Sequence, residues 1–305
     1  MGNTFYFDWE VRFMTWLQSY ADKFYILFAS ACTTLGEELV LVGMLGVLYW
    51  CFDKEIAKDV GKNLMIALLT GSFLKNIFLR RRPYFDNSAI ICLKPVDGNA
   101  DVFDIAAQGY SMPSLHSMNT VVAYGTLSQY TKKTWLRIIM TIIPFFVGLS
   151  RVMLGAHYPT DVIFGWIIGL LALVIGTYLK EKGTSFLKLG IVLAILFIPG
   201  WFFCNSTDFY SGYGLEIGLM FGFYFEEKKV NFPSTDKVIF KILRFVIGIG
   251  VFLGLSSLLK MPFSDEVLNG NNFAAHFIRS FRYAVSSFIP VGVYPLAFRI
   301  EQKFK

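Results

Sequence analysis

A succession of long apolar runs is the feature that most constrains how this chain can fold. A helix that crosses a bilayer needs about 20 consecutive, predominantly apolar residues, and about nine runs approach that length. They cover residues 24–51, 58–79, 114–130, 135–155, 158–179, 186–204, 210–226, 237–260 and 276–299. Only 16% of the residues are charged, whereas soluble proteins carry about 25%. The sequence therefore predicts an all-α, polytopic membrane helix bundle of about nine transmembrane helices.

The runs and the polar stretches between them predict three segments. Residues 1–57 hold a first span, preceded by a stretch (5–25) that mixes aromatic and charged residues at near-helical spacing, which is typical of an amphipathic helix lying at a membrane interface. Residues 58–204 form a core of five spans that contains the polar motifs described below. Residues 205–305 contribute additional C-terminal transmembrane helices.

The distribution of basic residues predicts an orientation in the membrane. The net charge is +6, but the basic residues punctuate apolar runs instead of forming the patch that a nucleic-acid partner requires, so we expect the lipid bilayer and no nucleic acid as partners. Alternating crossings place Lys54, Lys132 and Lys133 on one side, which the positive-inside rule makes cytoplasmic. The long polar loop 80–113 then faces the extracytoplasmic, or luminal, side. The oligomeric state stays open.

Three short polar segments meet on that outer side. The first is "KNIFLRRRP", residues 75–83. Lys75 and Arg82 are seven residues apart, so on one helix they would share a face two turns apart, and two cations on one face suit an anion. The alternative is that both are basic residues snorkelling at the membrane boundary.

The second segment is "YSMPSLHSMN", residues 110–119. Ser111 followed by Pro113 predicts a helix start with Ser111 as its N-cap. The unsatisfied N–H groups of such a first turn bind anions, phosphate especially. Ser114 adds a hydroxyl group and His116 a group that can give a proton near neutral pH, although a single histidine at a helix start is more often structural.

The third segment is "SRVMLGAHYPTD", residues 150–161. Arg151 ends one span, His157 lies in a tight turn and Asp161 lies in the first turn of the next helix. The Asp161 carboxylate can accept from an imidazole N–H of His157, which would leave the other ring nitrogen as a nucleophile. The alternative is a buried, ion-paired helix cap. Three cations, a helix N-terminus, an acid and a nucleophile together fit phosphoryl transfer.

The three segments also resemble a known family. Lys75-x6-Arg82-Pro83, Pro113-Ser114-Leu115-His116 and Ser150-Arg151-x5-His157-x3-Asp161 are similar in order and spacing to the signature motifs of the type 2 phosphatidate phosphatase superfamily. The resemblance extends over about residues 58–180 and concerns the integral-membrane branch of the superfamily. Leu115 is a departure, because many members carry glycine there.

The resemblance implies a role for each of these residues. Lys75, Arg82 and Arg151 would hold the phosphate oxygens, assisted by Ser114 and by backbone N–H groups near it, such as that of Leu115. His157 would attack phosphorus to give a phosphohistidine, Asp161 would orient it, and His116 would protonate the leaving alcohol. No metal ion and no other cofactor are implied.

We therefore expect a membrane phosphatase that hydrolyses lipid phosphate monoesters or pyrophosphates, such as phosphatidate, a sphingoid-base phosphate or an isoprenyl phosphate. A phosphotransferase or sugar phosphatase using the same site is one alternative, and a non-enzymatic lipid-phosphate transporter is another. His276, Arg279 and Arg282, near the outer end of the last run, could extend the site toward a lipid head group, but a structural role is favoured.

Overall fold

The computed structural model describes residues 2–304, and these residues form helices joined by turns and loops. They divide into two compact units. The first unit runs up to Leu41 and from Ile66 to Thr177, and the second runs from Val42 to Met65 and from Tyr178 onward. The three-segment division made from the sequence stays a prediction, because the units group residues by contact and not by sequence segment.

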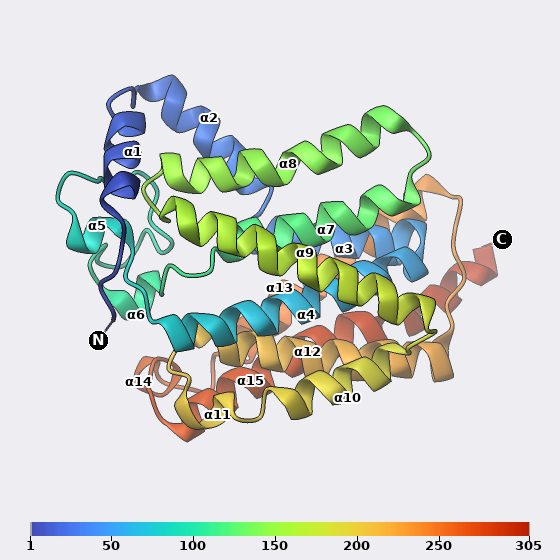
Figure 1. Ribbon diagram of the computed structural model, residues 1–305. Coiled ribbons are helices and arrows are strands. Elements are labelled where there is room, and N and C mark those ends of the chain that lie inside the picture. The colour runs from blue at the N-terminus through green and yellow to red at the C-terminus, as the bar shows by residue number, and fades with distance from the viewer. Residues whose placement is uncertain (1, 305) are drawn as a thin grey trace. The chain divides into compact units, whose positions relative to one another are not determined.

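The first unit is built around three long helices that follow one another in the chain. Figure 1 shows α7, α8 and α9 running side by side, with α1, α5 and α6 gathered at one end of them. The helices of this unit, including those that it shares with the second, are α1 (Asp8–Gln18), α2 (Lys23–Thr34), α3 (Glu38–Val47), α4 (Lys54–Phe78), α5 (Pro83–Asp86), α6 (Ile105–Gln108), α7 (Leu115–Tyr130), α8 (Thr134–Met153) and α9 (Pro159–Glu181).

Glycines on α9 allow it to approach α7 closely. A Cβ atom added at Gly165 would lie 2.7 Å from the carbonyl oxygen of Ser114, and one added at Gly169 would lie 2.8 Å from that of Met118. The backbone N–H of Ser114 also donates to the carbonyl oxygen of Asp161, at 3.0 Å. The beginnings of α7 and α9, which carry the second and third sequence motifs, therefore lie against each other.

The second unit has α12 and α15 at its centre. Its further elements are the π-helix η1 (Leu48–Phe52), α10 (Phe186–Leu196), α11 (Gly200–Phe203), α12 (Thr207–Phe225), the π-helix η2 (Glu226–Val230), α13 (Val238–Leu258), α14 (Asp265–Leu268), α15 (Phe273–Phe288), the π-helix η3 (Ile289–Val293) and the 3-10 helix η4 (Tyr294–Phe304). A Cβ atom at Gly214 or Gly218 would collide with the backbone of α15. This spacing of small residues is typical of helix packing in membranes, where side chains give way to close backbone contact.

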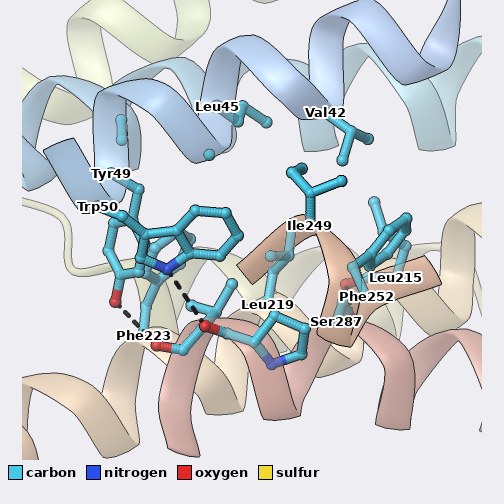
Figure 2. Close-up of a pocket in the computed structure, with 14 residues that line it drawn as sticks. Val42, Leu45, Tyr49, Trp50, Leu215, Leu219, Phe223, Ile249, Phe252 and Ser287 are labelled. Atoms are coloured by element: carbon cyan, nitrogen blue, oxygen red, sulfur yellow. Dashed lines mark hydrogen bonds between the residues drawn. The ribbon is translucent and has the colours of Figure 1, made fainter. Parts of the chain in front are cut away.

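An apolar cavity lies within the second unit, lined by residues of α3, η1, α4, α12, α13, α15 and η3 (Figure 2). At one side of it, the Tyr49 hydroxyl donates to the carbonyl oxygen of Val291 at 3.0 Å, and the Trp50 indole N–H donates to that of Pro290 at 3.3 Å. Both ring systems therefore turn their polar atoms toward η3 and leave apolar surface in the cavity.

The predicted number of about nine spans is not confirmed. Among the described residues, four helical stretches are long and apolar enough to cross a membrane, namely Thr134–Met153, Pro159–Glu181, Phe186–Phe203 and Val238–Leu258. A fifth is present if Lys23–Thr34 and Glu38–Phe52, which meet at 45°, form one broken span. The remaining runs are helical, but α7 and α15 have only 16 residues each and α4 carries several charged residues.

The predicted amphipathic helix over 5–25 is shorter in the structure. The helix α1 ends at Gln18, because the chain turns and Asp22 caps the next helix by accepting from the N–H of Tyr25 at 2.7 Å. The helix is two-faced, as expected: Glu10 is fully buried, whereas Trp16 is 55% exposed.

The close contact between α12 and α15 generates a first prediction. Gly218→Ala places a methyl group against the Ser287 hydroxyl and the carbonyl of Ala284, so we expect an overpacking cost of about 1–3 kcal/mol that exceeds the gain of about 1 kcal/mol in helix propensity. The midpoint of thermal unfolding in detergent should fall. Gly250→Ala in α13, where nothing lies within 4 Å of an added Cβ atom, is the matched control and should leave the midpoint unchanged or raise it. Equal midpoints for the two variants would contradict this packing.

Candidate active site

The helix α7 begins three residues later than the sequence indicates. Its N-cap is Ser114, whose Oγ accepts from the N–H and the hydroxyl of Ser117, so the prediction of Ser111 as N-cap is wrong. Ser111 instead donates to the carbonyl oxygen of Arg81, at 3.0 Å, and so links the second motif to the first. Leu115 and His116 are then the first two helical residues, with N–H groups in the first turn.

Lys75 and Arg82 do not share a helix face. The helix α4 ends at Phe78, because Leu79 adopts a left-handed conformation with a φ of 52° and turns the chain. Lys75 lies in the last turn of α4, whereas Arg82 is the N-cap residue of α5. Both side chains are nevertheless buried, at 4% and 3% exposure. The motif therefore places its two buried cations on either side of a turn, not on one face of a helix.

Arg82 connects the first motif to the third. Its Nε donates to the carbonyl oxygens of Gln108, at 2.8 Å, and Gly109, at 3.0 Å. Its Nη1 donates to the carbonyl oxygen of Ala156 at 2.9 Å and lies 3.4 Å from Nε2 of His157. This guanidinium thus holds loop 80–113 against the turn that carries His157.

His157 lies in the turn between α8 and α9, at 2% exposure. Gly155 makes this turn possible, because its φ of 75° is strained for other residues and an added Cβ atom would collide with the carbonyl oxygen of Ile91. The Nδ1 atom of His157 is buried, has no hydrogen-bond partner among the described residues, and lies 3.6 Å from Oδ2 of Asp161. The predicted pair is therefore present, but its separation is longer than a hydrogen bond.

The surroundings of His157 keep its imidazole neutral. Burial is the largest cause that holds the pKa of His157 well below 6.5, followed by the positive charges of Arg82, Arg151 and Lys75. His116 adds a smaller effect in the same direction. A neutral imidazole retains a lone pair, which a nucleophile requires.

Asp161 is held by partners other than His157. Its Oδ1 accepts from Nη1 of Arg80 at 2.6 Å, and its Oδ2 accepts from the N–H of Tyr158 at 2.8 Å. Sequence reasoning missed Arg80, which is 1% exposed and directly contacts a predicted site residue. No local signal distinguishes it from the two arginines that follow it.

Arg151 lies in the last turn of α8 and is 3% exposed. One of its nitrogens, Nη1, donates to the hydroxyl of Thr33 at 2.9 Å, whereas Nε is buried and finds no hydrogen-bond partner within residues 2–304. An unpartnered buried N–H is costly, and an acceptor from a bound ligand would relieve that cost. All the predicted site residues lie in the first unit, at the end where α5, α6 and the α8–α9 turn gather (Figure 1).

His276, Arg279 and Arg282 lie on α15, in the second unit. The His276 ring stacks on that of Tyr210, with ring centroids 3.8 Å apart, and Arg279 donates to the carbonyl oxygen of Leu268 at 2.9 Å. These are contacts within the second unit, in keeping with the favoured structural role.

The neutral state of His157 generates a prediction for the pH dependence of stability. The folded chain keeps this imidazole unprotonated at pH values where the unfolded chain, with an ordinary pKa near 6.5, takes up a proton. Stability is therefore lost as the pH falls below 6.5, by about 1.4 kcal/mol for each pH unit until the folded pKa is reached.

Thermal unfolding in detergent at about pH 5.5 and about pH 7.5 tests this linkage. The wild type should lose more stability than His157→Asn between these two values. Above about pH 7.5 the imidazole is neutral in both states, so the two proteins should then respond equally. If wild type and His157→Asn lost the same stability between about pH 7.5 and about pH 5.5, the imidazole of His157 would not be held neutral in the folded protein.

Comparisons with known protein families match two parts of the chain. Residues 59–185 match the PAP2 superfamily, and residues 210–302 match the PAP2 superfamily phosphatase, transmembrane extension. The first range contains every predicted site residue, from Lys75 to Asp161. The second range contains most of α12 and all of α13 and α15. The match to a transmembrane extension and the four or five apolar helices together identify a membrane protein.

Curated relatives include a probable sphingosine-1-phosphate phosphatase of Dictyostelium discoideum, 25% identical over 248 residues, which covers 71% of this chain and 56% of that protein. An undecaprenyl-diphosphatase of Sulfolobus acidocaldarius is 29% identical over 138 residues, covering 44% of this chain and 60% of that protein. A lipid A 4′-phosphatase of Bacteroides thetaiotaomicron is 25% identical over 171 residues, covering 53% of this chain and 72% of that protein.

The alignments thus span 56% and 60% of the length of the first two relatives. No solved structure matches the chain. The two family matches, in their order along the chain, confirm the resemblance drawn from the three motifs, and the chain belongs to the PAP2 superfamily.

Proposed function

We propose that this protein is a membrane phosphatase that hydrolyses a phosphate ester or pyrophosphate of a lipid. The observation that carries the proposal is a buried His157 whose Nε2 lies 3.4 Å from Nη1 of Arg82, with the charges of Lys75 and Arg151 also acting on its imidazole. A nucleophile among fixed cations is the arrangement that phosphoryl transfer requires, because catalysis there consists mainly of positioning and charge stabilisation. The relatives named above act on lipid phosphates, which supports a lipid substrate here.

The three cations would bind the non-bridging oxygens of the phosphate. The first turn of α7 would add the N–H groups of Leu115 and His116, since helix N-termini bind phosphate. Ser114 would support this turn as its N-cap and assist in binding. Because Arg82 lies 3.4 Å from Nε2 of His157, phosphate bound to Arg82 would stand next to that nitrogen.

The reaction would proceed in two steps. In the first, the lone pair of Nε2 of His157 attacks phosphorus, a P–N bond forms, and the ester P–O bond breaks while His116 gives a proton to the leaving oxygen. In the second, His116 takes a proton from water, whose oxygen attacks phosphorus, and the P–N bond breaks to release orthophosphate and the free imidazole. Asp161 would orient the ring by closing the 3.6 Å separation from Nδ1. The protein cations supply the charge stabilisation, so the proposed reaction needs no metal ion.

Phosphate release from a panel of lipids tests the proposal. The panel contains phosphatidate, a sphingoid-base phosphate and an isoprenyl phosphate and pyrophosphate, assayed in detergent. His157→Ala should lower the turnover number by at least about 10³-fold, and activity should persist in EDTA. The matched control is His276→Ala, which removes a histidine of the second unit and should retain activity. Full activity of His157→Ala would overturn the mechanism.

The role of His116 predicts a dependence on the leaving group. His116→Ala should slow release from lipid phosphates by about 10²–10⁴-fold, because an alkoxide leaves poorly without a proton. An aryl phosphate has a far more acidic leaving group and should be affected much less. Equal losses for both substrates would exclude His116 as the proton donor.

The rival functions give different results in the same preparation. A phosphotransferase should yield a phosphorylated acceptor in place of orthophosphate when an alcohol acceptor is added, and a sugar phosphatase should prefer sugar phosphates to the lipid panel. A lipid-phosphate transporter should move lipid in liposomes even when both His116 and His157 are replaced.

The proposal also places the site on the side of the membrane that faces away from the cytoplasm. In a variant whose four native cysteines are replaced by serine, Asn99→Cys in the exposed part of loop 80–113 should react with a membrane-impermeant thiol reagent in intact cells. Lys132→Cys, exposed in the loop between α7 and α8, should react only after the membrane is opened. The reverse pattern would place the site on the cytoplasmic side.

A further inference from the structure

Three buried charged residues from distant parts of the sequence form one ion-pair network behind the candidate site. They are Glu10 of α1, Arg80 between α4 and α5, and Asp161 of α9, and their exposures are 0%, 1% and 0%. Glu10 lies outside residues 59–185, which match the PAP2 superfamily. The network therefore joins a segment outside that matched range to a residue of the third motif.

Arg80 stands between the two carboxylates. Its Nη1 donates to Oδ1 of Asp161 at 2.6 Å, and its Nη2 donates to Oε2 of Glu10 at 2.8 Å. The other oxygen of Glu10, Oε1, accepts from the hydroxyl and the N–H of Thr160, at 2.6 and 3.1 Å. Glu10 thus contacts both Arg80 and the residue that precedes Asp161.

The N-terminal segment holds the Arg80 guanidinium from further directions. The Nε atom donates to the carbonyl oxygen of Phe5 at 2.8 Å, and the guanidinium lies over the rings of Phe5 and Tyr158, at 4.8 and 4.1 Å from their centroids. The backbone of Asn3 pairs with that of Arg80 in a parallel β-bridge. A planar, fork-shaped cation that is hydrogen-bonded through its nitrogens and packed against two aromatic rings has little freedom to reorient.

This arrangement determines which edge of Asp161 faces His157. With Oδ1 bound to Arg80 and Oδ2 bound to the N–H of Tyr158, the carboxylate plane is fixed. The oxygen 3.6 Å from Nδ1 of His157 is Oδ2. Rotation of the carboxylate toward a different partner would break a charge-assisted hydrogen bond in a buried site, which is strongly unfavourable.

We propose that Arg80 and Glu10 are positioning residues that act on His157 through Asp161. The inference rests on the phosphatase function proposed above. The N-terminal segment then supports the active site, because Glu10 holds Arg80 and Arg80 holds the carboxylate of Asp161. Neither residue touches the phosphate, so their removal impairs the chemical step and leaves the binding of the phosphate group intact.

The test compares Arg80→Lys with Arg81→Lys. Lysine keeps the positive charge at position 80, but its single ammonium group cannot reproduce the two guanidinium hydrogen bonds to Asp161 and Glu10. Arg81 is the adjacent, partly exposed arginine, paired with Asp86 at 3.1 Å, and its replacement is the matched control. We expect Arg80→Lys to lower kcat by about 10²-fold with the inhibition constant for orthophosphate changed by less than about two-fold, and Arg81→Lys to behave as the wild type.

A double-mutant cycle separates positioning from folding. If Arg80 acts through Asp161, then Arg80→Lys should cause little further loss, less than about three-fold, in a background that already carries Asp161→Asn. A purely structural role predicts the same loss in both backgrounds. Glu10→Gln keeps the shape of the side chain and is combined with Asp161→Asn in the same way. If Arg80→Lys does not fold, this second cycle distinguishes positioning from a structural role.

The outcomes distinguish this inference from the function on which it rests. If the wild type releases no phosphate from any substrate, the proposed function fails. If the wild type is active and His157→Ala is inactive, the function stands. In that case the inference is overturned when Arg80→Lys matches Arg81→Lys, when its losses multiply with those of Asp161→Asn, or when orthophosphate binding weakens in step with kcat.

Discussion

Backbone carbonyl groups that are buried without a partner are costly, and the guanidinium of Arg82 satisfies three of them at once. Two of these carbonyls belong to the long polar loop and one to the turn that carries His157. The end of the first unit is built from turns and short helices, which lack a hydrogen-bond ladder of their own. Arg82 supplies the connection between them, and the position of His157 depends on it.

The chemical groups of the candidate site could be recognised from the sequence, because an arginine, a histidine and an aspartate at short spacing are unusual beside apolar runs. The hydrogen bonds and ion pairs that connect these groups could not be recognised in the same way. Arg80 is one of three consecutive arginines, and what distinguishes it is Glu10, 70 positions earlier in the chain. A contact over that separation leaves no periodic or local signal. The third motif, which contains both His157 and Asp161, likewise gives no sign that Asp161 is bound by Arg80.

The fold was predicted best where one physical rule dominates. Apolar runs gave the positions of the helices, since backbone groups in lipid must be satisfied within the helix. Helix ends were harder to predict. The helix α4 ends just before the left-handed Leu79, and leucine has no preference for that conformation. Pro113 lies before the N-cap of α7 instead of inside its first turn. The predicted number of about nine spans is not confirmed, because short helices and charged helices also produce long, mostly apolar runs.

The contact between α12 and α15 has a consequence for how the second unit comes together. Gly214 and Gly218 meet Ser280, Ala284 and Ser287, and glycine and alanine have no side-chain rotamers to lose when they are buried. Packing these two helices against each other therefore costs little side-chain conformational entropy, in contrast to an interface built from leucine or methionine. Small residues also leave few interlocking side chains to fix how far one helix is shifted along the other. The hydrogen bond from the Ser280 hydroxyl to the carbonyl oxygen of Tyr210 therefore helps to fix the register of α15 on α12.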